Sequence, residues 1–217
     1  MNYSNDSMLS VAIPTRDGGA MIQTVLSLLQ VGRRLNRPTV FFIAEASNIP
    51  RGRNMILDQL RRRFPDRSTV PVLWVDSDIW IPPFAEQAIT DAIAWGDAHH
   101  ANVVANYLMA NGQTVLMNDR TTEARHFTPE EWQSLPDYAE VGMTGFGLLY
   151  VEQPLAYTFY ADRIGEDIHF WWDNPEIRIH VAKQITVGHR KSVMLSDTLP
   201  IPADRLPSTP LNPAILA

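Results

Sequence analysis

Two carboxylates that follow a short apolar segment of this chain could hold a divalent metal ion. Residues 72–75 are Val, Leu, Trp and Val, typical of a buried strand, and Asp76 and Asp78 come directly after them. If the backbone stays extended, side chains at i and i+2 point to the same face. Two such oxygen ligands suit Mg²⁺ or Mn²⁺, which complete their shells with water and substrate phosphates. The alternative is a turn in which Asp76, Ser77 and Asp78 only satisfy backbone groups.

The elements that must position these carboxylates alternate between strand and helix. Hydrophobic periodicity predicts strands at 9–13, 39–44, 70–75 and 102–107, with helices at 20–30, 53–63 and 84–95 between them. This order favours an α/β fold with a mainly parallel central sheet flanked by helices. In such sheets, ligands bind beyond the carboxyl ends of the strands.

Polar side chains gather at the predicted carboxyl ends. They are Thr15, Arg16 and Asp17 after the first strand, Glu45 after the second, and Asp76 and Asp78 after the third. Because these strand ends meet at one edge of the sheet, we expect a binding site there. The Pro14 and glycine positions nearby are equally compatible with a plain loop before a helix.

The second half of the chain departs from simple alternation. Residues 108–140 are polar and predict a surface insertion, in which Thr128 caps a helix and Glu131 completes a capping box. The segment 142–147 is rich in glycine. Gly145 and Gly147 permit close backbone approach by a ligand, but they are equally compatible with a bulge or tight turn.

Two further residues have the chemistry of a site. Asp167 begins a predicted amphipathic helix beside two tryptophans, where partial desolvation could make it a general base. A helix N-terminus alone also explains an acidic residue there. The segment 178–189 predicts two short strands that end at His189, whose imidazole is a candidate third metal ligand.

Six motifs in order make the chain resemble a glycosyltransferase of the GT-A fold, similar to the family 2 group and to related viral and bacterial enzymes. The resemblance covers roughly residues 8–190. The motifs are Ser10-Val-Ala-Ile-Pro-Thr15, Pro50-Arg-Gly-Arg-Asn54, Leu73-Trp-Val-Asp-Ser-Asp-Ile79, Thr144-Gly-Phe-Gly-Leu148, Gly165-Glu-Asp167 and Gly188-His189. The GT-A fold would add a small second sheet toward the C-terminal half.

The resemblance implies a role for each matching residue. The donor nucleotide sugar would contact the residues Pro14, Thr15, Arg16, Asp17, Glu45, Arg53, Asp76, Ser77, Gly145, Phe146 and Gly147. Of these, Arg53 would approach the diphosphate. Asp78 and His189, with Asp76, would hold Mn²⁺ or Mg²⁺. Asp167 would be the catalytic base of an inverting reaction, with Glu166 as an alternative or supporting base.

Composition limits the partners. The formal charge of −6 argues against broad attraction to nucleic acid, and the absence of cysteine excludes disulfides and thiolate metal sites. No apolar segment is long enough for a signal peptide or a membrane span, so we expect a cytoplasmic protein. UDP is the first expectation for the donor nucleotide and GDP the second, with a glycan, a lipid-linked glycan or a protein as the acceptor.

The predicted organisation is a single glycosyltransferase domain at 1–192, with a nucleotide-binding half at about 8–107 and a catalytic, acceptor-binding half at about 108–192. Residues 193–217 carry five prolines from Pro200 to Pro213 and predict an extended tail or a linker to further domains. Alternative functions are a nucleotidyltransferase acting on sugar phosphates and an inactive nucleotide- or sugar-binding module. A phosphohydrolase of the haloacid dehalogenase type would need the Asp pair after the first strand.

Overall fold

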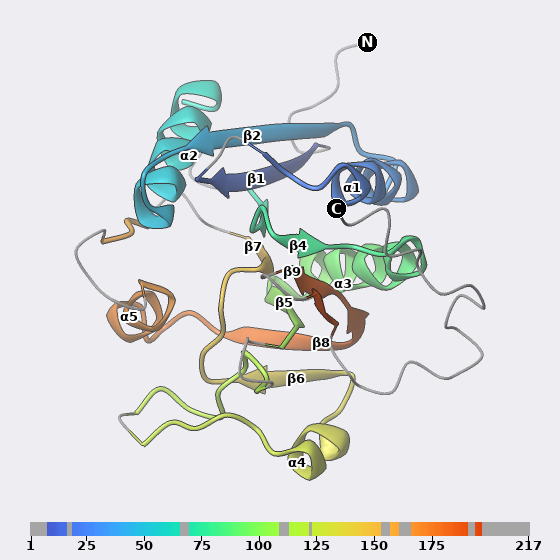
Figure 1. Ribbon diagram of the computed structural model, residues 1–217, viewed down its shortest axis with the longest axis vertical. Coiled ribbons are helices and arrows are strands. Elements are labelled where there is room, and N and C mark those ends of the chain that lie inside the picture. Colours follow the sequence, from blue (N-terminus) through green and yellow to red (C-terminus); the bar gives the residue numbers. More distant parts are fainter. Residues whose placement is uncertain are drawn as a thin grey trace.

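A computed structural model describes residues 8–16, 19–65, 70–108, 113–121, 123–152, 157–160, 166–190 and 194–196 (Figure 1). Among the predicted site residues, Asp17 lies outside the described residues, as does the side chain of Glu166. The proline-rich segment after residue 196 also lies outside them.

The first half has the predicted alternation. Its elements are β1 (Leu9–Thr15), α1 (Ile22–Arg34), β2 (Thr39–Glu45), α2 (Ile49–Arg63), β3 (Val72–Val75), α3 (Glu86–His99), which a short 3₁₀ turn at Pro83–Ala85 precedes, and β5 (Asn102–Asn106). The start of α2 follows a local rule: Asn48 caps the helix by accepting a hydrogen bond from the Arg51 amide at 2.9 Å.

The second half contributes α4 (Pro129–Ser134), β6 (Tyr138–Val141), β7 (Leu148–Val151), α5 (Glu166–Asp173) and β8 (Ile179–Thr186). The capping box of α4 is confirmed, because the Thr128 hydroxyl accepts from the Glu131 amide and the Glu131 carboxylate accepts from the Thr128 amide. The prediction of a surface insertion at 108–140 was incomplete. Its strand β6 joins the central sheet, and Leu116 and Trp132 are buried in the core.

The central sheet is mixed, with strand order β2-β1-β3-β7-β5-β8-β6. β1, β2, β3, β5 and β8 run in one direction, whereas β7 and β6 run against them. A small second sheet joins β4 (Ile79–Trp80), β9 (Gly188–Arg190) and β10 (Met194–Ser196). The domain boundary at residue 192 stays a prediction. An α/β architecture with helices on a largely parallel sheet and a small second sheet is therefore confirmed.

Helices cover both faces of the sheet, α2 and α5 on one side and α1 and α3 on the other (Figure 1). Each face has its own core, one around Leu57 and Trp171 and the other around Leu28 and Ile93. Because β1 and β3 are covered on both faces, every residue in them is buried, which explains their nearly continuous apolar sequence. Within the described residues, no helix combines the length and apolar character that a membrane crossing requires.

Candidate functional site

The two carboxylates of the Asp-x-Asp motif lie on a turn and do not share a strand face. β3 ends at Val75, and the Ile79 amide donates to the Asp76 carbonyl at 3.0 Å, which closes a turn over residues 76–79. Ser77 lies in this turn. The prediction that the chain stays extended through Asp78 was therefore wrong. The strand pairing stops at Val75, since its partner Leu148 is the first residue of β7. The turn directs the two carboxylates to different partners.

Asp76 is paired with a buried arginine from α2. Arg53, only 1% exposed, donates from Nη2 to Asp76 Oδ1 at 3.2 Å and from Nη1 to Asp167 Oδ1 at 2.7 Å. The two carboxylate side chains are 23% and 27% exposed. One guanidinium thus joins three segments that are far apart in the sequence, and its planar fork suits two carboxylates at once.

Aromatic rings hold the Arg53 guanidinium in place. Its Cζ atom lies 4.6 Å from the ring centre of Phe146 and 5.4 Å from that of Phe159. This packing favours a weakly hydrated guanidinium over a lysine. In this arrangement the Nη atoms face the two carboxylates and the side chain is buried. The approach of Arg53 to a diphosphate stays a prediction.

Helix α5 holds Asp167 in place because the aromatic side chains that follow it in the helix are buried in the core. Phe170 and Trp171 are buried, and Trp171 Nε1 donates to the Thr144 carbonyl at 2.5 Å. The Trp171 ring stacks on Phe146 with a centroid distance of 5.3 Å. These contacts fix α5 against the glycine-rich segment, which places Asp167 beside that segment. Trp172 is 42% exposed.

Asp78 is paired with His189 through the small second sheet. Ile79 of β4 lies opposite His189 of β9, and this register brings His189 Nε2 to 3.0 Å from Asp78 Oδ2. The His189 side chain is 11% exposed and that of Asp78 is 40% exposed. His189 Nδ1 is buried and makes no hydrogen bond with another described residue. As predicted, His189 lies close to the Asp-x-Asp motif, where it contacts Asp78.

The donor set at this point fits a divalent metal only in part. A carboxylate oxygen and an imidazole nitrogen suit Mn²⁺ or Mg²⁺, and Asp78 is open enough for further ligands. However, the described residues hold no group of three or more acidic, histidine or cysteine side chains arranged as a metal site. Asp76 Oδ1 is directed to Arg53. The protein therefore offers two close ligands in this region, and the remainder would come from water and substrate.

The glycine-rich segment packs tightly against the Asp turn. The Asp76 amide donates to the Gly147 carbonyl at 3.0 Å. A Cβ atom added to Gly147 would lie 2.5 Å from Tyr107 Cε1, and one added to Gly145 would lie 2.3 Å from Tyr107 Oη and 3.4 Å from Asp167 Oδ2. Both glycines are thus needed for close packing beside the carboxylates.

Tyr107 is the residue of this site that the sequence did not identify. Its hydroxyl accepts a hydrogen bond from the Gly147 amide at 3.2 Å, and its ring meets His189 edge-on at 5.1 Å. Burial, together with the charges of Asp76 and Asp167, raises the pKa of Tyr107 well above its ordinary value, so the phenol stays protonated. The available signal was that Tyr107 is the last residue of the predicted strand at 102–107, where the other strands also carry polar side chains.

The remaining predicted residues lie at the same edge of the sheet. Pro14 and Thr15 are buried at the end of β1, opposite Ala44 and Glu45 of β2. Arg16 and Glu45 are exposed. Because β1 and β3 are parallel, this end of β1 and the Asp76 turn belong to one edge of the sheet.

Comparison of the sequence with models of known protein families finds no match, and neither does comparison with curated proteins. The function therefore has to be inferred from the site itself together with the motif resemblance.

Proposed function

We propose that this protein is a metal-dependent GT-A glycosyltransferase that moves a sugar from a nucleoside diphosphate sugar, with UDP as the first candidate, to an acceptor hydroxyl. The observation that best supports this is the Arg53 bridge between Asp76 and Asp167, next to Asp78, which lies on the same turn as Asp76 and pairs with His189 of β9. These groups meet at the carboxyl edge of the parallel strands, where α/β proteins bind nucleotides.

Asp167 is the proposed base. In the transfer step, the acceptor oxygen forms a bond to the anomeric carbon as the bond from that carbon to the diphosphate oxygen breaks. The acceptor proton passes to Asp167, and the electron pair leaves with the diphosphate. Attack opposite the leaving group inverts the anomeric centre. Arg53 Nη1 donates to Asp167 Oδ1, and Oδ2, the oxygen on the Gly145 side, is the proposed proton acceptor.

Asp78 and His189 are the proposed protein ligands of the metal. A bound Mn²⁺ or Mg²⁺ would supply positive charge for the departing diphosphate. Both ions readily take water and phosphate oxygens for the rest of their shells, so two protein ligands are sufficient. Asp76, held by Arg53, is then assigned to the ribose or sugar of the donor rather than to the metal.

Arg53 is proposed as a positioning residue. Its guanidinium is buried among aromatic rings and lies between Asp76, which is proposed to contact the nucleotide sugar, and Asp167, the proposed base. It fixes the distance between these two groups through its planar fork, which is the kind of support that precise catalytic geometry needs.

Calorimetric titration of UDP and GDP, each with Mn²⁺ and with chelator, tests the donor site. We expect wild-type protein to bind one diphosphate only with metal and Asp78→Asn to lose this binding. Asp167→Asn should bind normally but fail to release nucleoside diphosphate from the sugar donor. Asp58→Asn, an exposed carboxylate on α2, is the matched control.

Other outcomes point to the alternatives. Release of inorganic diphosphate during turnover would indicate a nucleotidyltransferase. Binding that needs neither the metal nor Asp78 would contradict the proposed site, and metal-dependent binding without turnover of any donor would indicate a nucleotide-binding module.

A further inference from the structure

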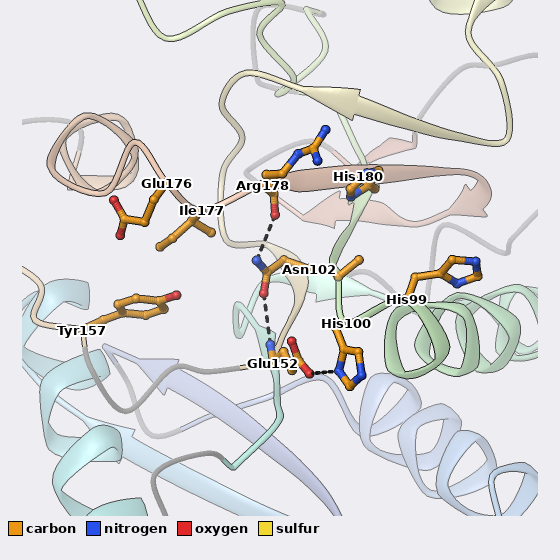
Figure 2. Close-up of a pocket in the computed structure, with 10 residues that line it drawn as sticks. His99, His100, Asn102, Glu152, Tyr157, Glu176, Ile177, Arg178 and His180 are labelled. Carbon is orange, nitrogen blue, oxygen red and sulfur yellow. Dashed lines mark hydrogen bonds and ion pairs between the residues drawn. The ribbon is translucent and has the colours of Figure 1, made fainter.

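Figure 2 shows a pocket with a volume of about 460 Å³. It lies at the opposite end of the sheet from the Asp76 turn. The antiparallel register of β3 and β7 pairs Val75 with Leu148 and Val72 with Val151. Glu152, at the pocket, therefore follows the end of β7 that is distant from Asp76. Four residues of strand separate the two ends by more than about 10 Å, so this is a distinct site.

The floor of the pocket is fixed by one amide side chain. Asn102 Nδ2 donates to the Arg178 carbonyl at 2.9 Å, and Asn102 Oδ1 accepts from the Glu152 amide at 3.0 Å. Figure 2 shows Asn102 between these two partners, with Tyr157 and Glu176 to one side and His100 below. These two hydrogen bonds hold the start of β5 to the segments that carry Arg178 and Glu152, so the amide shapes the pocket.

The positive charges near the pocket already have acidic partners. Arg178 donates to the Glu140 carboxylate from Nε at 3.0 Å, and His100 Nδ1 lies 2.6 Å from Glu152 Oε1. The Glu176 carboxylate is exposed, makes no ion pair or hydrogen bond with another described residue, and acts electrostatically on the Arg120 guanidinium. Among the residues that line the pocket, the carboxylates of Glu152 and Glu176 outnumber the one guanidinium, Arg178, when the histidines are neutral, which disfavours phosphate and other anions.

Tyr157 brings an aromatic ring and a hydroxyl to the same place. Its ring is held edge-on against Phe170 with a centroid distance of 4.9 Å. Burial and the charges of Glu176 and Glu152 raise the pKa of Tyr157 to about 12, so both carboxylates act on the phenol. Among the described residues, the Tyr157 hydroxyl has no hydrogen-bond partner.

We propose that this pocket binds a small organic cation with ammonium groups, such as an aliphatic amine, between the Glu176 and Glu152 carboxylates and the Tyr157 ring. An ammonium group donates charge-assisted hydrogen bonds to carboxylates and is attracted to an aromatic face. The apolar side chain of Ile177, which also lines the pocket, suits the methylene groups of such a ligand. The proposal is independent of the transferase activity.

Titration with 1,4-diaminobutane and with 1,4-butanediol, a neutral molecule of the same length, tests the need for positive charge. Isothermal calorimetry gives the affinity, and amide NMR shifts at Asn102 locate the ligand. We expect the diamine to bind and the diol to bind at least tenfold more weakly. Glu176→Gln should weaken diamine binding about tenfold, whereas Glu130→Gln, the same change on exposed α4, should leave it unchanged.

A pH series adds a second readout. The hydrogen bond and charge of Glu152 raise the pKa of His100, with a smaller contribution from Asp97. Protonated His100 neutralises Glu152 below this pKa and competes with the ligand. Diamine binding should therefore strengthen as the pH rises from 6 to 9, where the aliphatic ammonium groups stay largely charged. His100→Gln should lower this dependence, because it removes the group that pairs with Glu152, while the other charged or titratable side chains that line the pocket, Glu176, Arg178, His99 and His180, are unchanged.

Three results would overturn the proposal. They are equal affinity for diamine and diol, equal weakening by Glu176→Gln and Glu130→Gln, and diamine binding that shifts residues of the Asp76 turn instead of the pocket. Inorganic phosphate serves as the anionic probe, and binding of phosphate in preference to the diamine would also contradict it.

Discussion

Replacing Arg53 by methionine would test whether the buried guanidinium organises the site. The change removes two charge-assisted hydrogen bonds, to Asp76 and Asp167, each worth about 1.5 to 3 kcal/mol when the partner is left unpaired. It also removes contacts over Phe146 and Phe159, worth roughly 1 kcal/mol. Removing one partner of a fully buried pair costs about 3 to 5 kcal/mol.

The structure sets the expected value toward the lower end of this range. The two carboxylates are 23% and 27% exposed, so water can reach them when the guanidinium is gone. Methionine also fills part of the volume and keeps apolar contact with the rings. We therefore expect Arg53→Met to lower the free energy of unfolding by about 3 kcal/mol.

Urea denaturation followed by tryptophan fluorescence measures this loss. With a slope of about 2 to 3 kcal/mol per molar urea, the midpoint should fall by about 1 M or slightly more. Arg62→Met, an exposed position on the same helix, is the matched control and should change stability by less than about 0.5 kcal/mol. A loss below about 1 kcal/mol in Arg53→Met would refute the reasoning.

A double-mutant cycle separates the ion pair from simple packing. Asp167→Asn removes one of the charges that Arg53→Met leaves behind. If the pair is the cause, the double variant should lose at least about 1 kcal/mol less than the sum of the single variants. Additive losses would mean that Arg53 contributes only through its volume and its aromatic contacts.

Two further predictions concern close packing and acid stability. Gly147→Ala should cost about 1 to 3 kcal/mol because its Cβ would lie 2.5 Å from the Tyr107 ring; Tyr107→Leu should recover part of this loss in urea denaturation, and no recovery would contradict the assigned clash. Arg125 and the Thr128 cap lower the pKa of Glu131 from its ordinary 4.5 to about 2, so the stability from this carboxylate is present above pH 4.5 and lost as the pH falls to 2. Thermal melts should show wild type and Glu131→Gln differing at pH 6 and converging near pH 2, and a constant difference would exclude this cause.

Local sequence rules predicted most elements correctly because local interactions determine them. The apolar runs of β1 and β3 required burial on both faces, and the capping box at Thr128 and Glu131 specified the start of α4. The position of the candidate site was likewise predictable. Strands that alternate with helices run parallel, so the polar residues after them gather at one end of the sheet.

Long-range pairing decided what local rules could not. The insertion of β7 between β3 and β5 made the sheet mixed and ended β3 at Val75, so the Asp-x-Asp motif became a turn. The edge strand β6 came from a segment whose polar composition predicted only a surface insertion. Such pairings depend on contacts between distant residues, to which local periodicity is insensitive.

The sequence by itself determined the residue types of the candidate site and the sheet edge at which they meet. Only the tertiary structure decided their partners: Arg53 with Asp76 and Asp167, Asp78 with His189, and Tyr107 against the glycines. A guanidinium can satisfy carboxylates or phosphates equally well, and the choice depends on which groups the fold brings within about 3 Å of it.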